Sequence, residues 1–171
     1  MSFTIVALSN APSTVAALAD LLIETVANRG SIGFMHPVSP AKAVAFWGAA
    51  LEAAERGQRV VLGAFDGSVL AGTVSLLLDC PENQPHRGEI AKMMTAVRYR
   101  GRGVAGKLLR EAERIAVERG RTLLTLDTAE QEGAAGLYEK MGYQRTGLIP
   151  DFALMPYGGL TGSIVYWKRI S

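Results

Sequence analysis

A glycine- and arginine-rich segment, Arg98–Lys107, constrains the possible folds of this chain more than any other feature. It follows an expected strand, Glu89–Thr95, and precedes a run at about Lys107–Arg119 whose apolar residues fall on one face of a helix. Glycines let the backbone approach a ligand closely, and the start of a helix offers unpaired N–H groups and a partial positive charge. The segment therefore predicts a strand–loop–helix unit that binds a phosphate group.

Three phosphate-binding patterns overlap in this loop. Gly101-x-Gly103-x-x-Gly106 fits the dinucleotide fingerprint, with Asp127 about 20 residues further on. That pattern needs a second βαβ half, and the 43 residues after Thr128 are too few for one. Gly101–Lys107 also fits the phosphate loop of nucleotide hydrolases, but Leu108 stands where a Ser or Thr must hold magnesium. The third pattern, Arg100-x-x-Gly103-x-Ala105, meets no such objection.

The rest of the chain alternates expected strands and helices without a repeat or a low-complexity segment, which predicts one α/β domain over residues 1–171. Asp66-Gly67 joins two β-rich runs as a hairpin turn, and a β-loop-α-β unit follows. This order predicts a mixed, mostly antiparallel central sheet with helices on both faces. Besides those above, strands are expected at 3–8, 59–65, 69–78, 123–128, 143–146 and 163–168, and helices after Asn10 or Ser13, at about Pro40–Arg56 and at Gly133–Met141.

Composition excludes several function classes. The chain has 18 Lys and Arg against 16 Asp and Glu, so its charge gives no reason to expect a nucleic-acid partner. Cys80 is the single cysteine, and no His or Cys cluster has metal-ligand spacing. We find no signal segment and no run of about 18 apolar residues, so we expect a cytoplasmic protein with no membrane partner. Six cations nevertheless fall between Glu89 and Glu111 without any acidic residue among them: Lys92, Arg98, Arg100, Arg102, Lys107 and Arg110.

Two motifs in order resemble the GNAT N-acetyltransferases. Arg100-x-x-Gly103-x-Ala105 matches that family's R/Q-x-x-G-x-G/A loop, and Ala134–Tyr143 is similar to its A-x-x-L-Y-E-K-x-G-F/Y signature. The resemblance covers nearly all of the chain. The sequence departs from the family pattern at Val97, where many members have proline. Four segments look most like the tabtoxin-resistance acetyltransferase branch of the family: Glu24–Val26, Ser31–Met35, Leu123–Thr128 and the ending from Gly147 to Leu160.

The resemblance implies acetyl-CoA as the co-substrate and no metal. Its pyrophosphate would lie on the backbone amides of the glycine loop, with arginine and lysine side chains adding charge. Its pantetheine arm would pair with the preceding strand like an additional strand, and an N–H at that strand's kink would polarise the thioester carbonyl. The implied cofactor-binding residues are Met93, Met94, Thr95, Arg100, Gly101, Arg102, Gly103, Val104, Ala105, Gly106 and Lys107.

The resemblance also assigns catalytic roles. Tyr138 matches the family's general acid, and an unperturbed phenol is protonated at neutral pH. The base is either Glu89, acting through water, or Asp127 at the end of the neighbouring strand. Each residue also has a structural interpretation: Tyr138 as a half-buried helix tyrosine, Glu89 as a solvated strand residue and Asp127 as a turn cap. Phe34 and Met35 are expected to form the wall of the acceptor site.

The function implied is direct transfer of an acetyl group to a primary amine of a small molecule, such as an amino acid, an amine toxin or an antibiotic-like compound. Two alternatives remain open. One is a peptide or protein N-terminus as acceptor, and the other is a CoA-binding sensor domain without catalysis. A homodimer is compatible with the resemblance.

Overall fold

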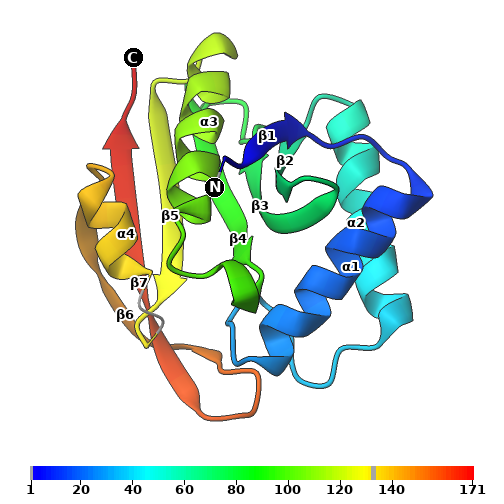
Figure 1. Ribbon diagram of the computed structural model, residues 1–171. Helices are drawn as coiled ribbons and strands as arrows, with labels where there is room; N and C mark the ends of the chain where they lie inside the picture. The colour runs from blue at the N-terminus through cyan, green and yellow to red at the C-terminus, as the bar shows by residue number, and fades with distance from the viewer. Residues whose placement is uncertain (1, 132–133) are drawn as a thin grey trace.

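The computed structural model describes residues 2–131 and 134–171, and within these residues seven strands form one sheet in the order β1-β2-β3-β4-β5-β7-β6 (Figure 1). The mixed, mostly antiparallel α/β architecture expected from the sequence is confirmed. The elements are β1 Thr4–Ala7, α1 Pro12–Ala27, α2 Pro40–Glu55, β2 Arg59–Asp66, β3 Val69–Leu77, β4 Arg87–Thr95, a short 3₁₀ helix Val97–Tyr99, α3 Val104–Glu118, β5 Leu123–Ala129, α4 Ala135–Lys140, β6 Gln144–Leu154 and β7 Leu160–Arg169.

The core lies on both sides of the middle of the sheet. Strands β2 and β3 are buried at consecutive positions, so both of their faces are covered. Helix α3 packs on β2, β3 and β4, while α1 and α2 pack against each other and against the same three strands (Figure 1). Two-sided burial therefore requires α3 to cover one face and the α1–α2 pair the other. Trp47 of α2 is completely buried in this core.

Strands β4 and β5 diverge along their length. All other neighbouring strands are antiparallel, whereas β4 and β5 run parallel in the described sheet and pair only from Arg87–Glu89 to Leu123–Thr125. Beyond Glu89, β4 continues to Thr95 with no pairing to β5. The backbone groups on that edge of β4 are consequently available to another extended molecule.

A β-bulge changes the direction of β4 within this unpaired stretch. Thr73 of β3 pairs with Met94 while Ser75 pairs with Ala91, so two residues of β4 oppose one residue of β3. Lys92, one of the two β4 residues opposite Val74, has a φ of 52° in the left-handed region. This conformation is uncommon for a residue with a side chain, and bulges of this kind redirect side chains.

The structure corrects two expected boundaries. Helix α3 begins at Val104 rather than near Lys107, because Gly103 takes a φ of 80° and serves as its N-cap. Strand β6 runs to Leu154 rather than ending near Thr146, with a register shift between Ile149 and Ala153 that accommodates Pro150. Gly133, the expected first residue of the last helix, lies outside the described residues. None of the helices in the described parts of the chain is long and apolar enough to cross a membrane.

Candidate active site

Two cavities meet where β4 and β5 diverge. The larger, called here the cleft, has a volume of about 670 Å³ and lies between the glycine loop, β4, α4 and the β6–β7 turn. The smaller, called here the pocket, has a volume of about 370 Å³ and lies between β4, β5, β7 and the α1–α2 loop. Ile32, Met93 and Ala134 line both cavities. A ligand that extends along the cleft therefore reaches the pocket at Met93.

The cleft brings together five of the residues expected to bind the cofactor. Met93, Met94 and Thr95 line it from β4, and Arg100 and Ala105 line it from the loop and from α3. The side chain of Met94 is buried in the core, so its backbone is the part available to a ligand. Arg100 donates a hydrogen bond from Nε to the carbonyl oxygen of Thr95 at 3.4 Å, which holds the loop against the end of β4.

The remaining loop residues form the rim next to Arg100 and Ala105. Gly101 and Gly103 take positive φ values of 75° and 80°, and the space around both is open. The first N–H groups of α3 have no acceptor within the helix, and its positive end faces this loop. Gly101, Arg102 and Gly103 are exposed, Lys107 is half-buried, and Val104 and Gly106 are buried. The described lining of the cleft does not include these six residues.

A close contact between strand and helix fixes the position of this loop. A methyl group added at Gly72 of β3 would lie 2.7 Å from the carbonyl oxygen of Met94 and 2.8 Å from Cγ1 of Val104. Gly72 therefore allows the first turn of α3 to sit directly on β3 and β4. Arg98 and Arg102 flank the ring of Tyr99, with guanidinium carbons 4.9 and 5.7 Å from its centroid.

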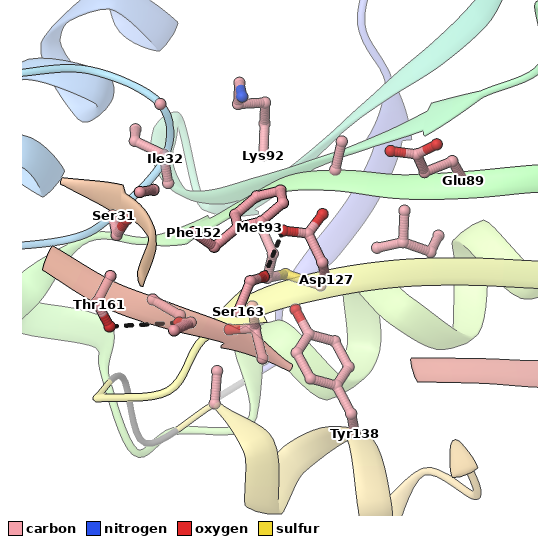
Figure 2. Close-up of a pocket in the computed structure, with 18 of the residues that line it drawn as sticks. Ser31, Ile32, Glu89, Lys92, Met93, Asp127, Tyr138, Phe152, Thr161 and Ser163 are labelled. Atoms are coloured by element: carbon pink, nitrogen blue, oxygen red, sulfur yellow. Dashed lines mark hydrogen bonds between the residues drawn. The ribbon is translucent and has the colours of Figure 1, made fainter. Parts of the chain in front are cut away.

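The three expected catalytic residues all line the pocket. Glu89 comes from β4, Asp127 from β5 and Tyr138 from α4 (Figure 2). Asp127 accepts a hydrogen bond of 2.8 Å from Oγ of Ser163. Glu89 accepts one of 3.3 Å from Arg87, which also donates to Oγ1 of Thr125 at 2.8 Å. The two carboxylates are thus each held by a neighbouring side chain.

Tyr138 is buried, with its ring centroid 5.8 Å from those of Tyr143 and Tyr166. Figure 2 shows its hydroxyl directed into the pocket, on the side of Asp127 and Ser163. Tyr166 donates a hydrogen bond to Glu139 at 3.1 Å, and burial together with Glu113 raises the pKa of Tyr143. The aromatic packing fixes the ring of Tyr138, so its hydroxyl occupies a defined position at the pocket.

Lys92, Phe152 and Ser163 are among the pocket residues that the sequence analysis did not select. Lys92 counts among the loop cations in the sequence, but the bulge directs it to the pocket, where its Nζ lies 5.7 Å from the ring centroid of Phe46. Burial lowers the pKa of Lys92, an effect that Asp127 and Glu89 oppose and Arg59 reinforces. No sequence signal marks a bulge that has no glycine, and none distinguishes Ser163 from other strand serines.

Phe34 and Met35, the expected wall of the acceptor site, are not in the described lining of either cavity. The lining of the two cavities that the structure describes on this side consists of Ser31, Ile32 and Gly33. Phe34 instead packs edge-on against Phe46, with centroids 5.2 Å apart, and Met35 is exposed. Phe34 therefore packs on α2, and its place in the acceptor site stays a prediction.

The described residues hold no group of three or more His, Cys, Asp or Glu side chains that is able to bind a metal ion. Their functional features are an open strand edge, a glycine loop at a helix N-terminus and a pocket with a tyrosine and two carboxylates. This combination of fold and site is typical of a transferase that uses a long phosphorylated co-substrate.

Comparison with known proteins gives the family. Residues 17–143 match the model of the Acetyltransferase (GNAT) family, and the chain belongs to that family. It is 30% identical over 109 residues to the probable N-acetyltransferase family 8 member 5 of Mus musculus, an alignment covering 61% of this chain and 46% of the mouse protein. The chain thus spans about half the length of that relative.

Solved structures show the same fold across the whole chain. An N-acetyltransferase from Staphylococcus aureus Mu50 superimposes with a TM-score of 0.84 at 14% identity, covering 100% of both chains. The yncA protein of Salmonella typhimurium, solved with its cofactor acetyl-CoA, superimposes with a TM-score of 0.82 at 17% identity, covering 100% of this chain and 95% of the other.

Proposed function

We propose that this protein is an acetyl-CoA-dependent N-acetyltransferase that transfers acetyl directly to a primary amine of a small molecule. The observation that carries the proposal is the meeting of the cleft and the pocket at Met93, with Tyr138 and Asp127 on the pocket side. A co-substrate held in the cleft would present its reactive end to an amine held in the pocket.

The chain's residues fit acetyl-CoA. Open positive-φ glycines and the N–H groups at the start of α3 suit a pyrophosphate, as does the charge of Arg100. The unpaired edge of β4 suits the amides of a pantetheine arm. When bound, acetyl-CoA supplies an activated acetyl thioester whose thiol is the leaving group. Fixing it near Met93 would convert the reaction with the amine into an effectively unimolecular one.

Tyr138 is proposed to protonate the departing thiolate, because its hydroxyl faces the pocket and a phenol is a donor at neutral pH. A carboxylate accepts the proton that the attacking amine loses. The hydrogen bond from Ser163 supports Asp127 in this role, while Glu89 is engaged by Arg87 and would act through water. No covalent intermediate on the enzyme is required.

The pocket's volume of about 370 Å³ favours a small acceptor over a folded protein segment. A peptide N-terminus is the second candidate, since the pocket opens beside the exposed Phe152 of β6. Membership of the tabtoxin-resistance branch, one domain over residues 1–171, a cytoplasmic location and a homodimer all remain predictions.

The test is a screen of amino acids, amine antibiotics, polyamines and short peptides with acetyl-CoA, followed as release of the free thiol. We expect thiol release with at least one small amine and no release when that amine is left out. Acetylation of peptides alone would transfer the proposal to the second candidate. Saturable binding of acetyl-CoA without transfer to any amine would favour a CoA-binding sensor instead.

A further inference from the structure

Lys92 is the cation of the pocket, and the described residues leave it without an anionic partner in contact. Its ammonium forms no salt bridge and no hydrogen bond within residues 2–131 and 134–171. Its position is set instead by the bulge, by the ring of Phe46 at 5.7 Å and by Gly33, where an added methyl group would lie 3.5 Å from Nζ. Desolvating a charge without pairing it is costly, so such a cation favours an anionic ligand.

Opposite charges line the same pocket. Asp127 and Ser163 lie beside Tyr138, whereas Lys92 stands on β4 nearer to Ile32 (Figure 2), and Asp127 is close enough to affect the pKa of Lys92. Arg59, at the start of β2, is close enough to Lys92 to affect its titration, and its Nε is buried without a hydrogen-bond partner among the described groups. The described lining of the pocket therefore combines one cation, Lys92, with the carboxylates of Asp127 and Glu89, neither of which contacts it.

We infer that the acceptor carries a carboxylate next to its amine, as an α-amino acid does, and that Lys92 binds this carboxylate while Asp127 receives the ammonium. The inference rests on the proposed N-acetyltransferase function and names its substrate class. A polyamine or an aminoglycoside would place only positive charge beside Lys92. A peptide acceptor, whose first carboxyl group is part of a peptide bond, would offer no negative charge to the ammonium of Lys92.

The experiment compares common L-amino acids with their carboxamides, which keep the ammonium and lack the carboxylate. For each pair, kcat/KM is measured by thiol release in the wild type, Lys92→Met, Lys92→Arg and Lys42→Met. Lys42 is the matched control, since it is exposed and its Nζ lies over the ring of Phe34, outside the described lining of the pocket. Thermal melting of each variant establishes that it is folded.

We expect the wild type to prefer acids over amides. In Lys92→Met the acid-to-amide ratio should fall by about tenfold or more, mainly through KM for the acid, because a hydrogen bond to a charged group is lost. Lys92→Arg should keep part of the preference for acids over amides, and Lys42→Met should keep the full preference of the wild type.

Two results overturn the inference and leave the proposed function standing: acetylation of amides with no activity on acids, or an equal loss for both in Lys92→Met. The second result would assign Lys92 to proton transfer rather than recognition. Failure to acetylate acids and amides alike would also overturn the inference, and it would contradict the proposed function only if the amine antibiotics and polyamines of the screen were not acetylated either.

Discussion

Ser163 of β7 donates a 2.8 Å hydrogen bond to Asp127 of β5, linking two strands on the floor of the pocket. Asp127 pairs with Val165 in the ladder, so Ser163 is its diagonal neighbour on the same face of the sheet. The bond occupies one oxygen of the carboxylate. The proposed function assigns the other oxygen to the acceptor amine, and the orientation of Asp127 depends on a residue that is far away in sequence.

Replacing the charge at this position tests its role. Asp127→Asn should lower kcat/KM for the amine by about tenfold to a hundredfold, because the amide keeps the shape of the carboxylate but neither attracts an ammonium nor accepts its proton. Ser163→Ala removes only the orienting bond and should cost less, roughly a few-fold. Steady-state kinetics with varied amine measure both effects. A Ser163→Ala loss larger than that of Asp127→Asn would contradict this order of importance.

The hydroxyl of Tyr138 is the proposed proton donor to the leaving thiolate. Tyr138→Phe keeps the buried ring and should lower kcat by about a hundredfold, with little change in KM for acetyl-CoA. Tyr99→Phe is the control, since it deletes a phenol hydroxyl that bonds to Asp66 at 3.0 Å, away from the pocket. Undiminished thiol release by Tyr138→Phe would leave the tyrosine with a structural role only.

The close packing at Gly72 should be required for both stability and cofactor binding. Gly72→Ala forces a methyl group against Met94 and Val104, and should reduce the free energy of unfolding by about 1–3 kcal/mol. It should also weaken acetyl-CoA binding by displacing the start of α3. Gly48→Ala in α2 meets nothing within 4 Å and should stabilise by up to about 1 kcal/mol. Denaturant unfolding measures the stability of the two variants, and calorimetric titration measures their affinity for acetyl-CoA. Equal stabilities of Gly72→Ala and Gly48→Ala would refute the packing argument.

Lys92 should destabilise the ligand-free protein near neutral pH. Burial lowers its pKa below the ordinary value, so the unfolded chain binds the proton more tightly than the folded one. The destabilisation is complete below the folded-state pKa and disappears as the pH rises to the ordinary lysine value of about 10.4. Lys92→Met should therefore raise Tm at pH 7, and its advantage should narrow toward pH 10. A Tm difference that is independent of pH would argue against a buried charge.

Local sequence signals predicted the elements well where local chemistry decides them. Asp66-Gly67 predicted the hairpin that β2 and β3 form, and Gly67 takes a φ of 60° in its turn. Ser39 before Pro40 gave the start of α2, where the serine side chain accepts a hydrogen bond from the Lys42 backbone at 3.2 Å. The mixed sheet followed from the order of these signals along the chain.

The parts that escaped prediction depend on contacts between distant segments. The bulge at Lys92 is set by its register against β3, and β6 continues past Pro150 because β7 pairs with it. Phe34 packs on Phe46, a packing choice that spacing cannot reveal. The catalytic candidates and five cofactor residues came together as cavity walls, whereas Lys92, Phe152 and Ser163 emerged only from the fold.

Binding of acetyl-CoA in the cleft is the claim on which the mechanism depends, and thermal stabilisation tests it most directly. At 100 times its dissociation constant, acetyl-CoA should add about 2.7 kcal/mol, or roughly 5–10 °C in Tm. Ala105→Glu places a negative charge in the cleft and should abolish this shift, while Ala49→Glu on the exposed face of α2 should retain it. ATP and NAD should give little shift. Stabilisation by ATP or NAD but not by acetyl-CoA would contradict the account.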